Sequence, residues 1–329
     1  MRTPEYDAII IGGSAAGLST AQSLGRARRR TIVLDDGSAR NRFASHMHNV
    51  LGHDGLPPAE LAARGREEAA RYGVEFRAAT VASVRDLTGS APAQPGAASL
   101  EVLLTDGSTL AARAVVVASG VTDELAPIPG LAERWGDTVL HCPYCHGWEV
   151  RDRPIGVIPS SPAGLHLARL VRQWSADLVV FAAGLGELDD DARGDFAARG
   201  VELVESAVVA VEDGDAAGVT VRTADGGAFE LAAVFTNSAM SPRADMLEPL
   251  GLEFTEGLMG TSIAVDAMGL TSHPRVWAAG NVANPAASVP MCAAAGTLAG
   301  AAANHALVED DYAAAPPPCR FCATRACYR

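Results

Sequence analysis

The sequence predicts an α/β chain with two doubly wound, three-layer, Rossmann-like domains. The first observation is the length, because 329 residues, of which 48% are hydrophobic and 20% charged, suffice for two cores. The second is a strand, a glycine turn, a helix and a second strand within residues 6–35, the unit from which such sheets are built. The third is a further pair of apolar strands, "IGVI" and "LVVF", in the middle of the chain.

Charge and composition exclude several classes of partner. A net charge of -13 and a pI near 5.0 leave nucleic acid or an anionic membrane without the basic face that each needs. No run of about 18 apolar residues lacks a charge, glycine or proline, and the first thirty residues do not resemble a signal peptide. We therefore expect a cytoplasmic protein that binds neither nucleic acid nor membrane. The six cysteines are too sparse and clustered for a secreted disulfide scaffold.

The N-terminal unit matches a dinucleotide-binding fingerprint. Gly12 permits a tight turn, Gly17 lets helix and strand pack closely, and the start of the helix offers N–H groups to a pyrophosphate. Asp35 ends the second strand, where it is placed to accept hydrogen bonds from ribose hydroxyls. Ser14 departs from the usual middle glycine. A glycine turn alone also suits a simple tight connection, but the strand, helix, strand and acid around it favour the nucleotide.

Two later segments carry a more specific resemblance. "AARAVVVASG" predicts a buried strand that ends in Ser119 and Gly120, and "PRVWAAGNVANPAA" predicts a strand, an Ala-Gly-Asn turn and the start of a small-residue helix. With the N-terminal unit, they resemble the thioredoxin-reductase-like family of FAD disulfide oxidoreductases. The resemblance implies a discontinuous FAD domain, residues 1–122 and 242–312, interrupted by an inserted NAD(P)-binding-like domain, residues 123–241.

The same resemblance implies how FAD is bound. The phosphates would lie on Gly12, Gly13 and Gly17, and the ribityl side on Gly280 and Asn281. Asn281 replaces the usual aspartate and still offers a hydrogen bond; the alternative is an ordinary turn residue with a left-handed backbone. The full set of expected FAD-binding residues is Gly12, Gly13, Ser14, Ala15, Ala16, Gly17, Asp35, Arg40, Arg42, Val81, Ser119, Gly120, Gly280 and Asn281.

The stretch "HCPYCHGWE" contains a C-x-x-C pair, Cys142 and Cys145. Such spacing serves zinc sites, structural thiols and redox centres. A zinc site needs two more ligands, and His141 and His146 adjoin the cysteines too closely in sequence to complete a tetrahedron easily. The pair lies where the resembling family carries its redox cysteines, so we favour a redox centre and expect no metal.

The resemblance also implies separate roles for the two cysteines. Cys145 would face the flavin as a thiolate, and Cys142 would exchange with the substrate sulfur. His146 follows the second cysteine, where thioredoxin reductases place an aspartate. With an ordinary pKa of about 6.5, a histidine accepts a thiol proton at neutral pH, which suits oxidation of dithiols. The alternative for His146 is a surface residue without a role.

The inserted domain lacks the features that would bind NADPH. The glycine turn is replaced by residues 159–162, "PSSP", whose prolines lack N–H groups, and "AAGLGE" after the next strand holds no basic cluster for a 2′-phosphate. The alternative is a divergent but functional site. Without NADPH, a dithiol substrate would reduce the cysteines, the cysteines would reduce FAD, and O2 would reoxidise it to give hydrogen peroxide.

This direction of flow resembles the dithiol oxidases of gliotoxin, holomycin and romidepsin biosynthesis. "CPYCHGWE", "RNRFASHMHNVLGHDGLPPAEL" and "AGNV" carry that resemblance, and the composition favours the bacterial holomycin type. It implies a homodimer that acts on a small-molecule dithiol. The competing hypotheses are a thioredoxin reductase linked to NADPH or ferredoxin, and a non-enzymatic flavin- or metal-carrying protein.

Four further cysteines lie outside the pair. Cys292, in the small-residue segment near the flavin, is expected to be a buried packing residue. Cys319, Cys322 and Cys327 lie in a proline-rich tail, residues 313–329, which suits a redox arm, half of a metal site or a disordered end.

Overall fold

The computed structural model describes residues 5–89, 94–162, 164–257 and 259–315. Their first large sheet contains seven strands in the order β3-β2-β1-β6-β5-β4, with β19 beside β6. Strands β1, β2, β3, β6 and β19 pair in parallel, and β4 and β5 add an antiparallel edge. The bounds are β1 Tyr6–Ile11, β2 Thr31–Asp35, β3 Glu75–Ala78, β4 Val81–Asp86, β5 Leu100–Leu104, β6 Thr109–Val117 and β19 Val276–Ala278.

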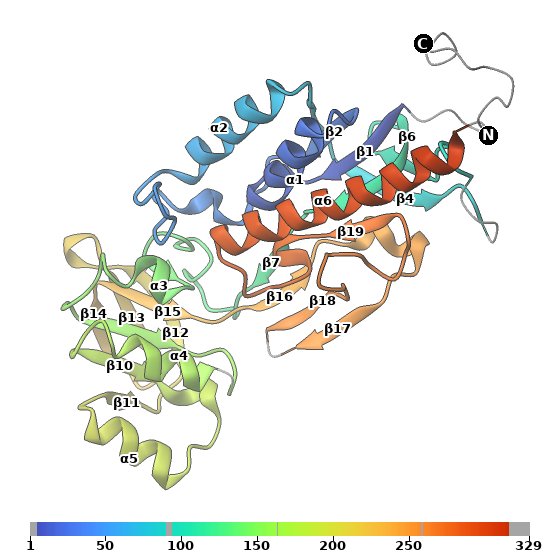
Figure 1. The fold of residues 1–329 in the computed structure, drawn as a ribbon. Helices are drawn as coiled ribbons and strands as arrows, with labels where there is room; N and C mark the ends of the chain where they lie inside the picture. The colour runs from blue at the N-terminus through green and yellow to red at the C-terminus, as the bar shows by residue number, and fades with distance from the viewer. Residues whose placement is uncertain (1–4, 90–93, 163, 258, 316–329) are drawn as a thin grey trace, which may run out of the picture.

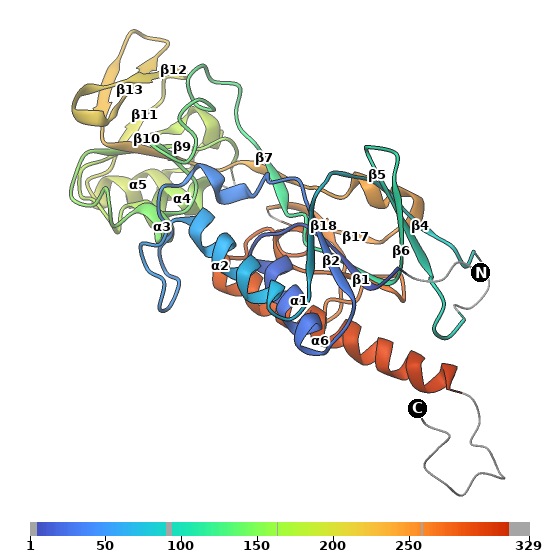
Figure 2. The same ribbon diagram turned by 90° about the horizontal axis from the view of Figure 1, so that it is seen from above.

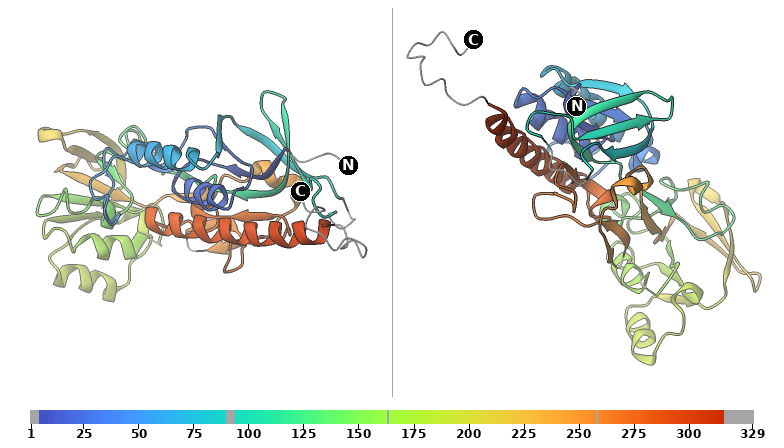
Figure 3. Two further views of the ribbon diagram at one scale, coloured as in Figure 1. Left: turned by 45° about the horizontal axis from the view of Figure 1, so that its top comes forward. Right: turned by 90° about the vertical axis from the view of Figure 1, so that its right-hand side faces the viewer.

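Small residues hold two helices tightly against this sheet. Helix α1 (Ala15–Arg26) and the long helix α6 (Val289–Ala314) lie along each other (Figures 1 and 3). A Cβ on Gly296 of α6 would lie 2.0 Å from the Ala16 carbonyl oxygen of α1, so only glycine permits this approach. Thr20 Oγ1 joins the helices by donating to the Gly296 carbonyl oxygen at 2.9 Å. The first and last parts of the chain therefore pack together.

Helix α6 is the one described helix that is long and apolar enough to cross a membrane by length and composition. A third of its apolar window is buried. The buried residues form a stripe that packs on α1: Cys292, Gly296, Ala299, Gly300, Ala303 and Leu307. That stripe gives α6 the arrangement of a core helix in this structure.

A second Rossmann-like sheet forms from the middle of the chain. Its order is β11-β10-β9-β15-β8, with parallel pairs throughout. Helices cover one face and a three-stranded antiparallel sheet, β12-β13-β14, packs on the other. The strand bounds are β8 Val139–Leu140, β9 Ile155–Ile158, β10 Leu178–Phe181, β11 Glu202–Val204, β12 Val208–Asp213, β13 Val219–Thr223, β14 Ala228–Leu231 and β15 Ala233–Thr236. The helices are α3 Pro143–His146, α4 Gly164–Val171 and α5 Asp190–Ala198, with 3-10 turns η2 Ala182–Leu185 and η3 Asp215–Ala217.

Two paired strands join the bodies. β7 (Val121–Glu124) leads into the second body (Figure 2) and β16 (Ala239–Pro242) leads back, and they pair antiparallel (Figure 1). β16 continues into a small sheet with β18 (Gly260–Ile263) and β17 (Phe254–Gly257). The expected domain boundaries at 122/123 and 241/242 fall inside β7 and β16. The remaining elements are α2 Pro58–Ala70, η1 Arg40–Phe43, η4 Asp245–Leu250 and η5 Gly280–Val282.

Candidate active site

The glycine turn between β1 and α1 requires its glycines. Gly12 has a φ of +103°, and a Cβ there would lie 2.3 Å from the Ala118 carbonyl oxygen. A Cβ on Gly17 would lie 1.9 Å from the Gly12 carbonyl oxygen. These contacts bring α1, β1 and the end of β6 together, and they leave the backbone of the turn open on its outer side.

The start of α1 suits an anion. Ser14 is the N-cap, and its side chain makes no capping hydrogen bond within the described structure. The first turn of this described helix holds no acidic residue, so its backbone N–H groups and the positive end of the helix dipole favour a phosphate. Among the predicted residues, Ala15 and Ala16 lie in this turn and pack into the core beneath it.

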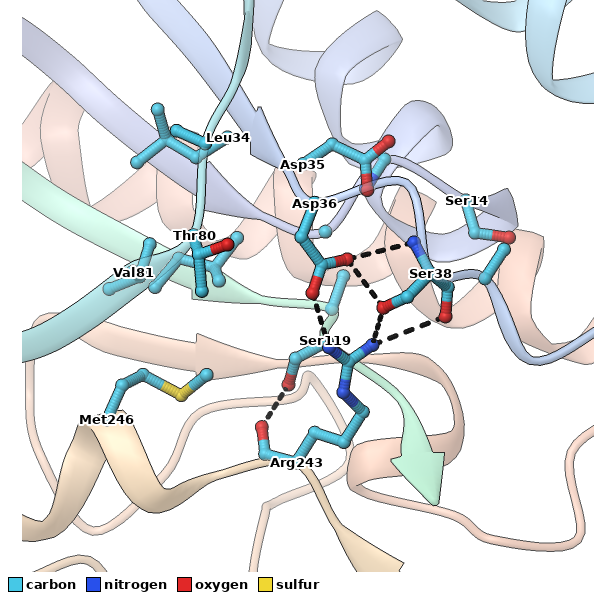
Figure 4. A pocket seen from close by; sticks show the side chains of 16 residues that line it. Ser14, Leu34, Asp35, Asp36, Ser38, Thr80, Val81, Ser119, Arg243 and Met246 are labelled. Carbon is cyan, nitrogen blue, oxygen red and sulfur yellow. Dashed lines mark hydrogen bonds and ion pairs between the residues drawn. The ribbon is translucent and has the colours of Figure 1, made fainter. Parts of the chain in front are cut away.

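A pocket opens beside this turn, at the carboxyl ends of β1, β2 and β6 (Figure 4). The predicted residues that line it are Gly12, Gly13, Ser14, Asp35, Val81 and Ser119. Asp35 Oδ1 accepts a 3.1 Å hydrogen bond from the Gly13 N–H, and Arg66 pairs with the other carboxylate oxygen. Backbone donors and a carboxylate around one pocket fit the phosphate and ribose of a dinucleotide, so the donor set fits FAD.

The sequence did not indicate a second polar network in the same pocket. Arg243, which follows β16, donates to Ser38 Oγ at 2.6 Å and pairs with Asp36 (Figure 4). Burial alone would raise the pKa of Asp36, but hydrogen bonds from Ser38 and Arg243 outweigh it and hold the pKa below its ordinary value. Ser119 Oγ donates to the Arg243 carbonyl oxygen at 2.6 Å. The returning chain therefore closes one wall of the pocket.

Three other residues predicted to bind FAD are engaged within the protein. Arg40 makes two hydrogen bonds to the carboxylate of Asp123, and Arg42 donates to the carbonyl oxygen of Ala39 and stacks on the Phe43 ring. Gly120 has a φ of +76°, and its carbonyl oxygen accepts from the Arg243 N–H. Contact of these residues with FAD stays a prediction.

The Gly280–Asn281 turn lies against the start of α1. A Cβ on Gly280 would lie 2.9 Å from Ala16 Cβ. The left-handed backbone that the sequence allows for Asn281 occurs instead at Gly280, whose φ is +80°. Asn281 Nδ2 donates to the carbonyl oxygens of Asn284, Pro285 and Ala287, so its amide closes the turn before α6. The Asn281 amide nitrogen therefore stabilises the turn. Only the side-chain oxygen and the backbone of Asn281 are left for its predicted role in FAD binding.

Cys292 is buried beside this turn, as predicted. Its Sγ lies 3.7 Å from Asn281 Oδ1. Burial raises the pKa of the Cys292 thiol to about 11, so the group stays a protonated thiol at neutral pH. A protonated thiol is a poor nucleophile, which suits a packing role. The tail cysteines, Cys319, Cys322 and Cys327, lie outside the described residues.

The two cysteines of the C-x-x-C motif form a disulfide. Cys142 is the N-cap of α3, whose first residue is proline, and Cys145 lies one turn later, so their Cα atoms are 5.2 Å apart. Both are partly exposed. Within the described residues no group of three or more His, Cys, Asp or Glu side chains is placed to hold a metal ion. The geometry therefore provides an accessible disulfide that a thiolate can attack.

His146 follows the disulfide at the end of α3. Burial lowers the pKa of His146 below its ordinary value, while the charge of Glu149 acts in the opposite direction and that of His48 adds to the lowering. At neutral pH the ring is therefore mostly neutral and has a lone pair for a proton. Its predicted role as a base stays a prediction.

His141, directly before the disulfide, is a second candidate for the base. Its Nδ1 is buried and, among the described residues, is the one buried side-chain nitrogen or oxygen without a hydrogen-bond partner. Burial and the charge of Arg40 lower the pKa of His141, although Asp123 opposes them. An unpaired buried acceptor or donor calls for a ligand, water or substrate group.

Hydrogen bonds from Asn237 and close backbone packing close the turn after β9. Asn237 Oδ1 accepts the Ser160 N–H at 3.0 Å, and Ser160 Oγ donates to the Asn237 carbonyl oxygen at 2.9 Å. Asn237 Nδ2 donates to Ser161 Oγ at 3.2 Å. A Cβ on Gly184, in η2, would lie 1.8 Å from the Pro159 carbonyl oxygen. The space where a Rossmann domain would bind a pyrophosphate is therefore lined by donors already in use and by close backbone packing.

Two Rossmann-like sheets, a dinucleotide pocket and an accessible C-x-x-C disulfide define a flavin-dependent disulfide oxidoreductase. A model of the pyridine nucleotide-disulphide oxidoreductase family matches residues 6–300, and the chain belongs to that family. The crystal structure of HlmI is 43% identical, with a TM-score of 0.85, and the match covers 93% of this chain and 94% of that one.

Curated relatives agree with this assignment. "Thioredoxin reductase tcpT" of Claviceps purpurea is 30% identical over 92% of this chain and 95% of its own length. A "Probable thioredoxin reductase" of Arthroderma benhamiae is 34% identical over 54% of this chain, and the match spans only 44% of that relative's length. The chain is therefore a thioredoxin-reductase-like oxidoreductase with FAD as its cofactor and a Cys142–Cys145 redox disulfide.

Proposed function

We propose that this protein is a dithiol oxidase that closes an intramolecular disulfide in a small-molecule dithiol, with FAD as cofactor and O2 as the final electron acceptor. The turn closed by Asn237 is the observation that carries the proposal. Pro159 and Pro162 supply no N–H, the Ser160 N–H is already used, and residues 182–189 contain no arginine or histidine for a phosphate. We infer that the flavin therefore takes its electrons from the thiol substrate and not from NADPH.

The residues around the disulfide support the thiol steps. His146 accepts the proton of the first substrate thiol, and the resulting thiolate attacks Cys142 Sγ. The Cys142–Cys145 bond breaks, and Cys145 leaves as a thiolate with the electron pair. The second substrate thiol then releases its proton to solvent and attacks the substrate sulfur of the mixed disulfide. The substrate disulfide forms, and Cys142 leaves as a thiolate.

The residues that would hold FAD are those that line the pocket at α1. Gly12 and Gly13 would let the phosphates approach the turn, the N-terminus of α1 would bind them, and Asp35 would bind the adenosine ribose. FAD, when bound, takes two electrons from the reduced cysteine pair and passes them to O2, which yields hydrogen peroxide. Cys145 would lie nearer the flavin and Cys142 nearer the substrate.

Oxygen consumption tests the proposal. The purified protein, loaded with FAD, is mixed with dithiothreitol or another 1,4-dithiol, and oxygen uptake and peroxide are measured with and without NADPH. We expect one peroxide for each disulfide formed and the same rate in both samples. Turnover that requires NADPH would contradict the proposal.

A thioredoxin reductase is the second candidate, because the name of the Claviceps purpurea relative carries that activity. It predicts that NADPH bleaches the flavin rapidly in an anaerobic sample and that a thioredoxin disulfide is then reduced. The oxidase predicts that the flavin stays yellow with NADPH and bleaches only with a dithiol. The same anaerobic spectrum therefore separates the two functions.

We also propose that the oxidase is a cytoplasmic homodimer. Met291 and Leu298 are about half exposed on the side of α6 that faces away from α1, with relative exposures of 50% and 46%. A second copy that covers this surface would bury apolar area that a lone chain leaves in water. Light scattering on the FAD-loaded protein gives the mass, and a monomer at micromolar concentration would rule the dimer out.

A further inference from the structure

Residues 46–56 form a closed loop that projects from the first body toward α3, and we call it the histidine loop (Figure 1). The Met47 N–H donates to the Leu56 carbonyl oxygen at 3.0 Å, and the Gly55 N–H donates to the Met47 carbonyl oxygen at 2.9 Å. Asn49, which has a φ of +59°, donates its N–H to Asp54 Oδ1 at 3.0 Å. These hydrogen bonds join the two ends of the loop, so the backbone that carries His48 is held in a defined position.

His48 lies between two carboxylates that come from different bodies. Its Nδ1 is 3.3 Å from Asp54 Oδ2 within the loop, and its Nε2 is 3.4 Å from Glu149 Oε1, three residues beyond His146. The side chain of His48 is 25% exposed and that of Glu149 is 41% exposed. The pair is therefore a contact between the histidine loop and the segment that carries the redox cysteines.

We propose that Glu149 is a positioning residue for the thiol step, because its negative charge stabilises His146 as a proton acceptor. His48 contacts the same carboxylate, so the charge of His48 determines how strongly Glu149 stabilises the protonated form of His146. The inference rests on the proposed function, because it assigns a partner to the base. Nothing in the C-x-x-C motif itself requires an acid at this position. The relation arises because Glu149 lies three residues after His146, in the turn that follows α3, and contacts His48 of the histidine loop.

The electrostatic sign of each neighbour is different. When His146 takes a proton from a substrate thiol, the negative charge of Glu149 stabilises the imidazolium that forms. A protonated His48 competes for the same carboxylate and opposes a second positive charge nearby. His141 directly precedes the disulfide, and the charge of His146 lowers the pKa of His141, so a protonated His141 opposes a positive charge on His146. Asp54 acts on His146 only through His48, because its carboxylate is a second hydrogen-bond acceptor for the His48 ring.

Two charge-removing substitutions should therefore have opposite effects. Glu149→Gln keeps the size of the side chain but removes the charge that supports the imidazolium, so His146 should hold its proton less strongly. His48→Gln keeps a donor for Glu149 and cannot become charged, so His146 should hold its proton more strongly. A residue with only a structural role would not produce shifts of opposite sign.

The test uses the full-length protein loaded with FAD. Histidine labelled with 15N is titrated by NMR, and the His146 signal is assigned by its loss in His146→Ala. In parallel, dithiothreitol reduces the flavin anaerobically across pH. In Glu149→Gln we expect the His146 titration and the acid limb of the rate profile to move to lower pH, and the plateau rate to fall about two- to fivefold, the range of a partly exposed ion pair.

In His48→Gln both curves should move to higher pH. Glu202→Gln is the control, because Glu202 is exposed on β11 and far in sequence from the cysteines, and it should change neither curve. An unmoved His146 titration in Glu149→Gln overturns the inference whatever the activity shows. If the titration moves while His146→Ala leaves the rate at pH 7 intact, the proposed base is wrong and the catalytic part of the inference falls with it.

Discussion

Arg40 of η1 and Asp123 of β7, the strand that leads into the second body, form a bidentate ion pair. Arg40 Nε and Nη2 donate to the two oxygens of the Asp123 carboxylate at 2.8 and 2.7 Å. Ser238 Oγ, next to β16, donates to the same carboxylate at 2.6 Å. The Asp123 side chain is only 7% exposed and that of Arg40 is 23% exposed. Three segments therefore meet at one carboxylate in the connection between the bodies.

Breaking this pair should destabilise the protein. Asp123→Asn leaves Arg40 without its charged partner in a mostly buried site, and the loss of one partner of a buried pair costs about 3–5 kcal/mol. Asp213→Asn is the matched control, because Arg134 and Asp213 also form a 2.7 Å pair but Asp213 is 94% exposed. Urea denaturation should show a much lower midpoint for Asp123→Asn and a change below about 1 kcal/mol for the control.

The same pair predicts a dependence of stability on pH. Burial alone would raise the pKa of Asp123, but the hydrogen bonds and charge of Arg40 outweigh it, and the pKa lies below its ordinary value. A carboxyl with a depressed pKa stabilises the fold above the unfolded pKa of about 3.9, and the contribution fades as pH falls through the folded pKa. The difference in urea midpoint between wild type and Asp123→Asn should therefore be full at pH 7 and shrink below about pH 4. A difference in urea midpoint that does not change with pH would show that Asp123→Asn destabilises the protein through packing and not through the lost charge.

Gly17→Ala should abolish FAD binding. The added Cβ would meet the Gly12 carbonyl oxygen at 1.9 Å, so the turn must open or α1 must move away from the phosphate site. Gly194→Ala is a suitable control, because Gly194 lies in α5 with nothing within 4 Å of an added Cβ. The ratio of flavin to protein absorbance in the purified variants measures the effect. A yellow Gly17→Ala protein would show that the turn does not hold the cofactor.

The two cysteine variants should lose dithiol oxidation but differ in colour. Cys142→Ser retains Cys145, which we expect as a thiolate beside the flavin, with a long-wavelength charge-transfer band. Cys145→Ser should lack that band. Absorbance spectra of the oxidised variants at pH 8 provide the measurement. A band that occurs only in Cys145→Ser would reverse the two assignments.

His146→Ala should slow anaerobic flavin reduction by dithiols about a hundredfold to ten-thousandfold near pH 7, the contribution of a positioned base. The rate should recover partly as pH approaches the thiol pKa of about 8.5, since the substrate then ionises without help. FAD content and the disulfide should be intact. His141→Ala is measured beside it, because the buried Nδ1 of His141 makes it the other histidine at the disulfide. If only His141→Ala is slow, the base is His141.

The sequence predicted those parts of the site that short segments encode. The turn at Gly12 and the C-x-x-C pair depend on neighbours within a few residues, so their geometry follows from spacing and backbone preference. Arg243 was missed because it reaches Ser38 only after the chain has returned through β16. The contact of His48 with Glu149 was missed for the same reason, since it depends on how two bodies are placed. Asn281 was expected at the flavin, with an ordinary turn residue as the alternative, and its amide does close the turn before α6.

The close approach of α1 and α6 sets the order in which this chain can fold during synthesis. Strands β8 to β15 are contiguous in sequence, so their sheet can assemble as soon as those residues have left the ribosome. The dinucleotide pocket cannot form so early, because Ala16 of α1 packs against Gly296 of α6, which is made after the whole second sheet. The apolar face of α1 therefore stays uncovered while the second sheet is made. Cofactor loading consequently follows the synthesis of α6.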